Sequence, residues 1–217
     1  RQGGHAVSFV QHFYGTSYQE AMELLLGNEL GKAYPAAQPK QEGPPKPFAL
    51  PPPHTDMRRM YAYLMKQRHI SREVITHFAR IGLLYEDAQY HNCVFVGMDE
   101  QGVPRHAHKR STNSQGKSFK VNVEGSRPQY SFHHVGQDGR LYVFEAPIDL
   151  LSFLTLYPDG WQEHSYVALC GTGSQAMHWM LEQNTYLHDV VLCLDHDEPG
   201  QTAANRLQEE LQGAGYH

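Results

Sequence analysis

The sequence has no long apolar run, no paired cysteines and no large excess of charge of one sign. No segment approaches the ~20 consecutive apolar residues of a membrane-spanning helix, and no apolar core of a signal peptide follows Arg1. We therefore expect no membrane partner and a cytoplasmic location. The first residue is not Met, which suggests a fragment of a longer protein.

Cysteine is scarce and is not arranged for metal binding. Cys93, Cys170 and Cys193 each lie in an apolar, strand-like run, and no Cys-x-x-Cys pair is present. Buried free thiols in a reducing compartment are the expected state. A zinc site within this chain is not expected, and the scattered histidines are interpreted as mostly surface residues.

The net charge of −5 is not typical of a nucleic-acid-binding protein, but the basic residues are unevenly distributed. Six of the 18 Lys and Arg residues fall between positions 105 and 127. Such a basic segment beside an acidic site would suit a phosphodiester held next to a metal ion. The candidate contacts to nucleic acid are Arg105, Lys109, Arg110 and Lys120.

Composition and periodicity divide the chain into four parts. The first has two short helical patterns, with a capping box formed by Ser17 and Glu20. The second is Pro-rich and extended, either a spacer or a ligand for an SH3 or WW domain. The third mixes helical and strand patterns, and the fourth alternates strands with helices. The predicted parts are residues 1–32, 33–55, 56–138 and 139–217.

The third part is expected to be a small α+β subdomain. Two helices, over 55–68 and from Ser71 onward, precede strands near 93–98, 103–109 and 118–123. In the last strand, alternation places Lys120 and Asn122 on one face. This face is either a solvated surface or one that contacts phosphates.

The fourth part predicts a parallel sheet flanked by helices, which is an α/β fold. Strands near 141–145, 166–170 and 190–194 are each followed by a helical pattern, and right-handed crossovers bring their carboxyl ends to one edge. Ligands bind at that edge in open α/β sheets. The residues expected there are Glu145, Gly171, Thr172, Gly173, Ser174, Asp195 and Asp197.

These residue types suit phosphate chemistry with a metal ion. Asp195 and Asp197 can hold Mg²⁺ or Mn²⁺, and Glu145 can complete the metal site or transfer a proton. The turn 171–174 offers backbone N–H groups to an anion. Asp149 either supports Glu145 or caps its helix. The alternative for Asp195 and Asp197 is a purely structural role, in a turn and at the N-cap of the following helix.

Three motifs resemble the blocks of a Toprim domain, the catalytic fold of DnaG-type primases, type IA and type II topoisomerases and some nucleases. They are Val143-Phe-Glu-Ala-Pro-Ile-Asp-Leu-Leu-Ser152, Gly171-Thr-Gly-Ser174 and Leu194-Asp-His-Asp-Glu-Pro-Gly200. Primases usually have Glu-Gly where this chain has Glu145-Ala146, and the form here resembles proteins of mobile elements. A later acidic block of such proteins is expected beyond His217.

The earlier parts resemble other modules of the same proteins. Gly3-Gly-His-Ala-Val-Ser-Phe-Val10 and Gly15-Thr-Ser-Tyr-Gln-Glu-Ala-Met-Glu-Leu-Leu25 are similar to the tail of the zinc-ribbon module of primases. The resemblance implies zinc ligands only upstream of Arg1. Residues 57–132 look like the uncharacterised domain that precedes Toprim in proteins of plasmids and conjugative transposons.

The resemblance implies that the full-length protein is an enzyme, a DNA primase-like nucleotidyltransferase with Mg²⁺ or Mn²⁺ at Glu145, Asp195 and Asp197. Its partners would be single-stranded DNA, nucleotides and a helicase or relaxase. Two other functions are compatible with the residues. One is a Toprim nuclease or nicking enzyme, and the other is a non-catalytic DNA-binding module of plasmid transfer.

Overall fold

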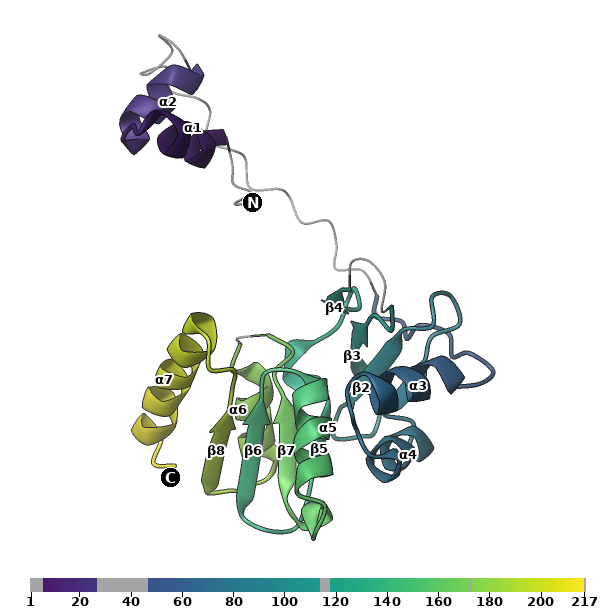
Figure 1. Cartoon of the computed structure of the whole chain (residues 1–217). Helices are drawn as coiled ribbons and strands as arrows, with labels where there is room; N and C mark the ends of the chain where they lie inside the picture. The colour runs from purple at the N-terminus through teal and green to yellow at the C-terminus, as the bar shows by residue number, and fades with distance from the viewer. Residues whose placement is uncertain (1–5, 27–46, 114–117, 172, 217) are drawn as a thin grey trace. The chain divides into compact units, whose positions relative to one another are not determined.

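The computed structural model describes residues 6–26, 47–113, 118–171 and 173–216 (Figure 1). The chain divides into two compact units, Arg1–Pro44 and Pro45–His217. In the first unit, the capping box is confirmed, because the Ser17 N–H donates to Glu20 Oε2 at 2.7 Å and the Glu20 N–H donates to Ser17 Oγ at 3.3 Å. It starts the second of two helices, α1 (Ala6–Tyr14) and α2 (Tyr18–Leu26).

The second unit begins with two helices and an antiparallel sheet with strand order β1-β2-β3-β4. Ser71 Oγ accepts the Val74 N–H at 3.3 Å and so caps the second helix. The sequence analysis had not identified the first strand. The elements are α3 (Arg58–Lys66), α4 (Arg72–Arg80), β1 (Leu84–Glu86), β2 (Cys93–Met98), β3 (Pro104–Arg110) and β4 (Lys120–Asn122).

The last residues of the predicted Pro-rich spacer lie along β1. The His54 N–H donates to the Glu86 carbonyl, and the Ala88 N–H donates to the Pro52 carbonyl, each at 2.8 Å. Pro53 and Asp87 form an isolated antiparallel bridge. The segment around residues 52–54 is therefore attached to the sheet.

The remainder of the unit is the predicted α/β sheet, with strand order β5-β7-β6-β8. β6 pairs in parallel with both β7 and β8, and β5 is antiparallel at the edge. The α/β fold class is confirmed. The elements are η2 (Pro128–Tyr130), β5 (His133–His134), β6 (Arg140–Phe144), α5 (Pro147–Leu156), η3 (Trp161–Glu163), β7 (Ser165–Ala168), α6 (Gln175–Gln183), β8 (Asp189–Cys193) and α7 (Glu198–Gly213).

Alternating residues of β6 face two different layers of helices. Leu141 and Val143 belong to the apolar cluster formed with α6 and α7, whereas Phe144 belongs to the cluster that contains α5. The second cluster also contains Phe78 of α4 and Phe95 of β2. The two sheets of Pro45–His217 therefore share the apolar cluster that contains α5. On the other side of the β5–β8 sheet, α7 lies beside β8 (Figure 1).

Within the described ranges, no helix combines the length and apolar content needed to cross a bilayer.

The buried His106 of β3 is expected to make the stability of the second unit sensitive to acid. Its side chain is 0% exposed, and neither ring nitrogen has a hydrogen-bond partner. Burial lowers its pKa from 6.5 to about 4, and the nearby charge of His108 adds to this. Between pH 6.5 and pH 4, His106 is protonated in the unfolded chain but remains neutral in the folded chain. The free energy of unfolding therefore falls as the pH drops from 6.5 towards 4.

We expect the His106→Leu variant to lose less stability over this range than the parent chain, by about 3 kcal/mol. Urea unfolding at several pH values between 7 and 4 measures the difference. Other buried histidines, such as His133, are present in both proteins, so their contribution cancels. Parallel stability curves for the two proteins would contradict the assignment to His106.

Candidate active site

The parallel strands bring the predicted acidic residues to one edge of the sheet. Phe144, the last residue of β6, is level with Ala168 of β7 on one side and Cys193 of β8 on the other. Glu145 follows Phe144 directly, and Asp195 comes two residues after the end of β8. The structure thus places both carboxylates just beyond the carboxyl ends of neighbouring strands.

Glu145 meets the basic strand of the preceding subdomain. Lys120 Nζ of β4 lies 3.4 Å from Glu145 Oε1, and the two side chains are 56% and 19% exposed. Both line a cavity of about 250 Å³ that also contains Asn122 and Gly171. The face that carries Lys120 and Asn122 is therefore turned towards the acidic edge.

Asp149 lies in the first turn of α5, beside the same acidic residues. Its pKa is raised, first by burial and then by the negative charge of Asp195 and of Glu145, while Arg68 lowers it. Asp149, Asp195 and Arg68 line a second cavity of about 130 Å³. Asp149 therefore lies close enough to Asp195 and to Glu145 for their negative charge to act on it, and a cation would relieve this repulsion.

Asp197 has a structural role that the sequence analysis considered as an alternative. Its Oδ1 accepts the Gly200 N–H at 2.9 Å and caps α7. A Cβ at Gly200 would lie 2.1 Å from the Asp195 carbonyl oxygen, so glycine allows the helix to start close to this loop. Both aspartates are exposed. The second carboxylate oxygen of Asp197 accepts no hydrogen bond from any described residue.

The glycine turn follows β7 and leads into α6, as predicted. Cys170 and Gly171 both have positive φ angles, 55° and 154°, and Ser174 is at the N-cap of α6 without a side-chain capping bond. Thr172 lies outside the described residues. Anion binding by Gly171, Gly173 and Ser174 stays a prediction.

The predicted basic contacts divide between two faces of the sheet. Arg110 is level with Lys120 in the β3–β4 register, and both line the 130 Å³ cavity. Arg110 Nε also donates to Tyr63 Oη at 3.2 Å. Lys109 is level with Val121 and so points to the opposite face. Arg105 Nε lies 2.7 Å from Asp99 Oδ2 and is held by that ion pair.

Two further cavity-lining residues were not identified from the sequence. Arg68 follows α3, and its charge reaches Asp149. His108 lines both cavities, and its Nδ1 lies 2.7 Å from Asn122 Oδ1. Burial lowers the pKa of His108, and the charges of Lys120 and Arg110 add to this, while its hydrogen bond with Asn122 raises the pKa. Only the strand register could have indicated His108, because it is on the same face as Arg110.

The donor set suits a hard divalent cation. Glu145, Asp149 and Asp195 supply carboxylate oxygens, and the exposed Asp197 lies two residues further on. Mg²⁺ and Mn²⁺ prefer such oxygen ligands and keep several water molecules. The residues present therefore fit the metal expected from the sequence.

Two protein families match consecutive parts of the chain. Residues 62–138 match the family described as "Protein of unknown function (DUF3991)". Residues 142–217 match the family described as "Toprim-like". Residues 142–217 form a Toprim-like domain. Neither match reaches residues 1–32, so the zinc-ribbon resemblance there stays a prediction.

An uncharacterized protein of Bacillus anthracis, pXO2-78, is 25% identical to this chain over 229 residues. The match covers 94% of the chain, and the chain spans 62% of the length of that relative.

Two solved structures of primases are among those similar to this chain. The primase fragment of the bacteriophage T7 primase-helicase protein is 17% identical, with a TM-score of 0.49 over 64% of this chain and 56% of that chain. The Aquifex aeolicus primase, with its zinc-binding and RNA polymerase domains, is 16% identical. Its TM-score is 0.49 over 99% of this chain and 63% of that chain.

Proposed function

We propose that this chain belongs to a primase-like enzyme that makes RNA primers on single-stranded DNA, in the replication or transfer of a mobile element. The observation that carries the proposal is the acidic edge of the Toprim-like sheet, where Glu145 and Asp195 meet the cationic side chains of the preceding subdomain. Toprim domains generally bind divalent metal ions. Nucleotidyl transfer needs both a metal site and contacts to phosphates.

The residues divide this work between them. Asp195 and Asp197 would hold Mg²⁺ or Mn²⁺, which would neutralise charge on the reacting phosphate. Glu145 would either complete the metal site or act as the general acid or base. Its carboxylate is 19% exposed and pairs with Lys120. Asp149, in the first turn of α5, would support the position of Glu145.

The phosphates would be bound from two sides. Arg110 and Lys120 face the acidic edge and supply positive charge to the template backbone. The N–H groups of the turn 171–174 would bind nucleotide phosphates at the start of α6. A helicase or relaxase is the expected protein partner.

The test uses the full-length protein with nucleoside triphosphates, Mg²⁺ and single-stranded DNA. Short RNA products that disappear with EDTA are expected. Shortening of the DNA strand instead would identify a nuclease or nicking enzyme. DNA binding that EDTA leaves unchanged, with neither product formed, would identify a non-catalytic binding module.

The basic face can be tested separately by its dependence on salt. Lys120→Ala is expected to weaken binding to single-stranded DNA and to lower the slope of log affinity against log salt by about 0.7. Arg105→Ala is the matched control, because Asp99 already pairs with Arg105. Equal slopes for the Lys120 variant and the parent chain would contradict a phosphate contact at Lys120.

A further inference from the structure

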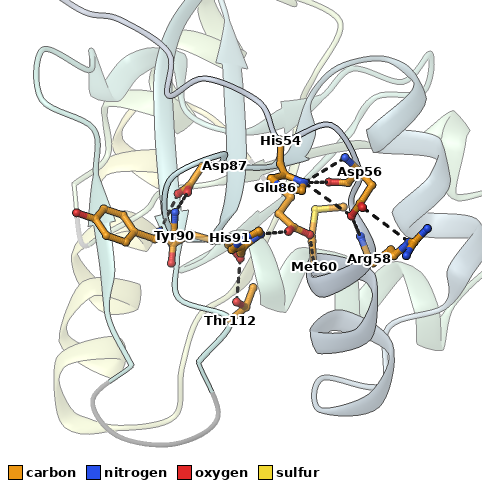
Figure 2. Close-up of polar contacts among 10 residues, drawn as sticks. His54, Asp56, Arg58, Met60, Glu86, Asp87, Tyr90, His91 and Thr112 are labelled. Carbon is orange, nitrogen blue, oxygen red and sulfur yellow. Dashed lines mark hydrogen bonds and ion pairs between the residues drawn. The ribbon is translucent and has the colours of Figure 1, made fainter.

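A second group of metal-binding side chains lies outside the acidic edge, where β1 ends. His54, Glu86 and His91 each offer one ligand atom, and these atoms all lie within 4.8 Å of one another (Figure 2). They come from three places in the chain: the segment before α3, the end of β1 and the turn before β2. The fold brings them together, and no short sequence motif contains all three.

Glu86 is the unusual member of this group. Its side chain is 1% exposed, yet none of its described contacts is to Lys or Arg. Its Oε2 accepts the Met60 N–H at 2.8 Å, and its Oε1 lies 2.6 Å from His91 Nδ1. A buried carboxylate is costly unless a cation accompanies it. A metal ion held by Glu86 together with His54 and His91 would supply that cation.

Hydrogen bonds to neighbouring residues orient the three candidate ligands. His54 Nδ1 lies 3.0 Å from the Asp56 carbonyl oxygen and 3.1 Å from the Asp56 backbone nitrogen, so this ring nitrogen is held against Asp56. Among the described residues, Nε2 has no hydrogen-bond partner and is the ring nitrogen available to a metal ion. Thr112 Oγ1 donates to the His91 carbonyl at 2.8 Å, which fixes the turn. Hydrogen bonds of this kind orient the ligands of metal sites.

We propose that His54, Glu86 and His91 bind a zinc ion. Two imidazole nitrogens and one carboxylate oxygen suit Zn²⁺ better than Mg²⁺. The ion lies between His91 Nδ1 and Glu86 Oε1. The distance between these two atoms increases from 2.6 Å to about 3.3 Å, as tetrahedral bonds to zinc require. Water completes the coordination, since the side chains of His54 and His91 are 27% and 33% exposed.

This site goes beyond the proposed function, because none of its ligands lines the acidic edge. It also differs from the sequence analysis, which expected zinc only upstream of Arg1. The ion would fasten the segment around His54 to β1 and to the turn before β2. Two backbone hydrogen bonds already join that segment to β1.

The test measures Zn²⁺ binding to the full chain by competition with a coloured chelator. Excess Mg²⁺ is present to fill the oxygen-rich acidic edge. We expect one equivalent of tightly bound zinc, and at least a tenfold loss of affinity in His54→Ala and in His91→Ala. The control is His178→Ala, because His178 Nε2 pairs with Glu210 Oε2 at 3.0 Å but has no third ligand.

X-ray absorption of the zinc-loaded parent chain keeps the proposal testable if a variant misfolds. Nitrogen and oxygen ligands near about 2.0–2.2 Å, without sulfur near about 2.3 Å, are expected. Sulfur in the first shell would overturn the assignment, and so would unchanged affinity in both histidine variants. A parent chain that binds less than one equivalent would also overturn it, leaving a His91–Glu86 ion pair.

Discussion

Glu145→Gln is expected to reduce primer synthesis by the full-length protein about 10²–10⁴-fold, the usual contribution of a general acid or base. The change keeps the size of the side chain but removes its charge and its ability to take a proton. It also breaks the ion pair with Lys120, which contributes little to stability because both groups contact solvent. The measurement is the rate of RNA primer formation at saturating DNA and nucleotide.

Glu182→Gln is the control for this prediction, because Glu182 is an exposed residue of α6 and lines neither cavity. A second variant, Asp195→Asn with Asp197→Asn, removes the expected metal ligands. Asn at position 197 still caps α7, so the helix is retained. Undiminished synthesis in this double variant would rule out the proposed metal site, even if the Glu145 variant were inactive.

Phe132→Ala is expected to destabilise the whole second unit by about 3–5 kcal/mol, because it empties a large space in the core. The Phe132 ring is 0% exposed. Its centroid lies 5.0 Å from that of Phe78 in α4 and 5.4 Å from that of Phe95 in β2. Its carbonyl accepts the Ala168 N–H of β7 at 2.9 Å. Phe132 thus contacts β2 through its ring and β7 through its backbone carbonyl.

Urea unfolding followed by tryptophan fluorescence measures this effect, since Trp161 and Trp179 belong to different apolar clusters. We expect Phe132→Ala to unfold in a single transition, at a lower urea concentration than the parent chain, with both tryptophans reporting the same midpoint. Leu156→Ala is the control, because Leu156 is 73% exposed and should change stability by less than about 0.5 kcal/mol. Two separate transitions in the parent chain would show that the two apolar clusters unfold independently.

Local patterns were enough to predict most elements. The capping box at Ser17, the cap at Ser71 and Pro147 at the first turn of α5 depend only on residues close in the sequence. β1 was missed because it has three residues, Leu84–Glu86, and its burial pattern does not alternate. A strand of three residues is too short to show the alternation of apolar and polar residues that identifies a strand.

The acidic edge could be predicted from the order of the strands along the chain. Parallel strands place their carboxyl ends together, so Glu145, Gly171 and Asp195 could be grouped before any coordinates existed. The residues opposite them depend on contacts between distant segments. The packing of the two sheets brought Arg68, His108 and Lys120 to that edge, and the β2–β3 hairpin brought Arg105 to Asp99. It also brought together His54, Glu86 and His91, because contacts between distant segments leave no periodic signal in a single sequence.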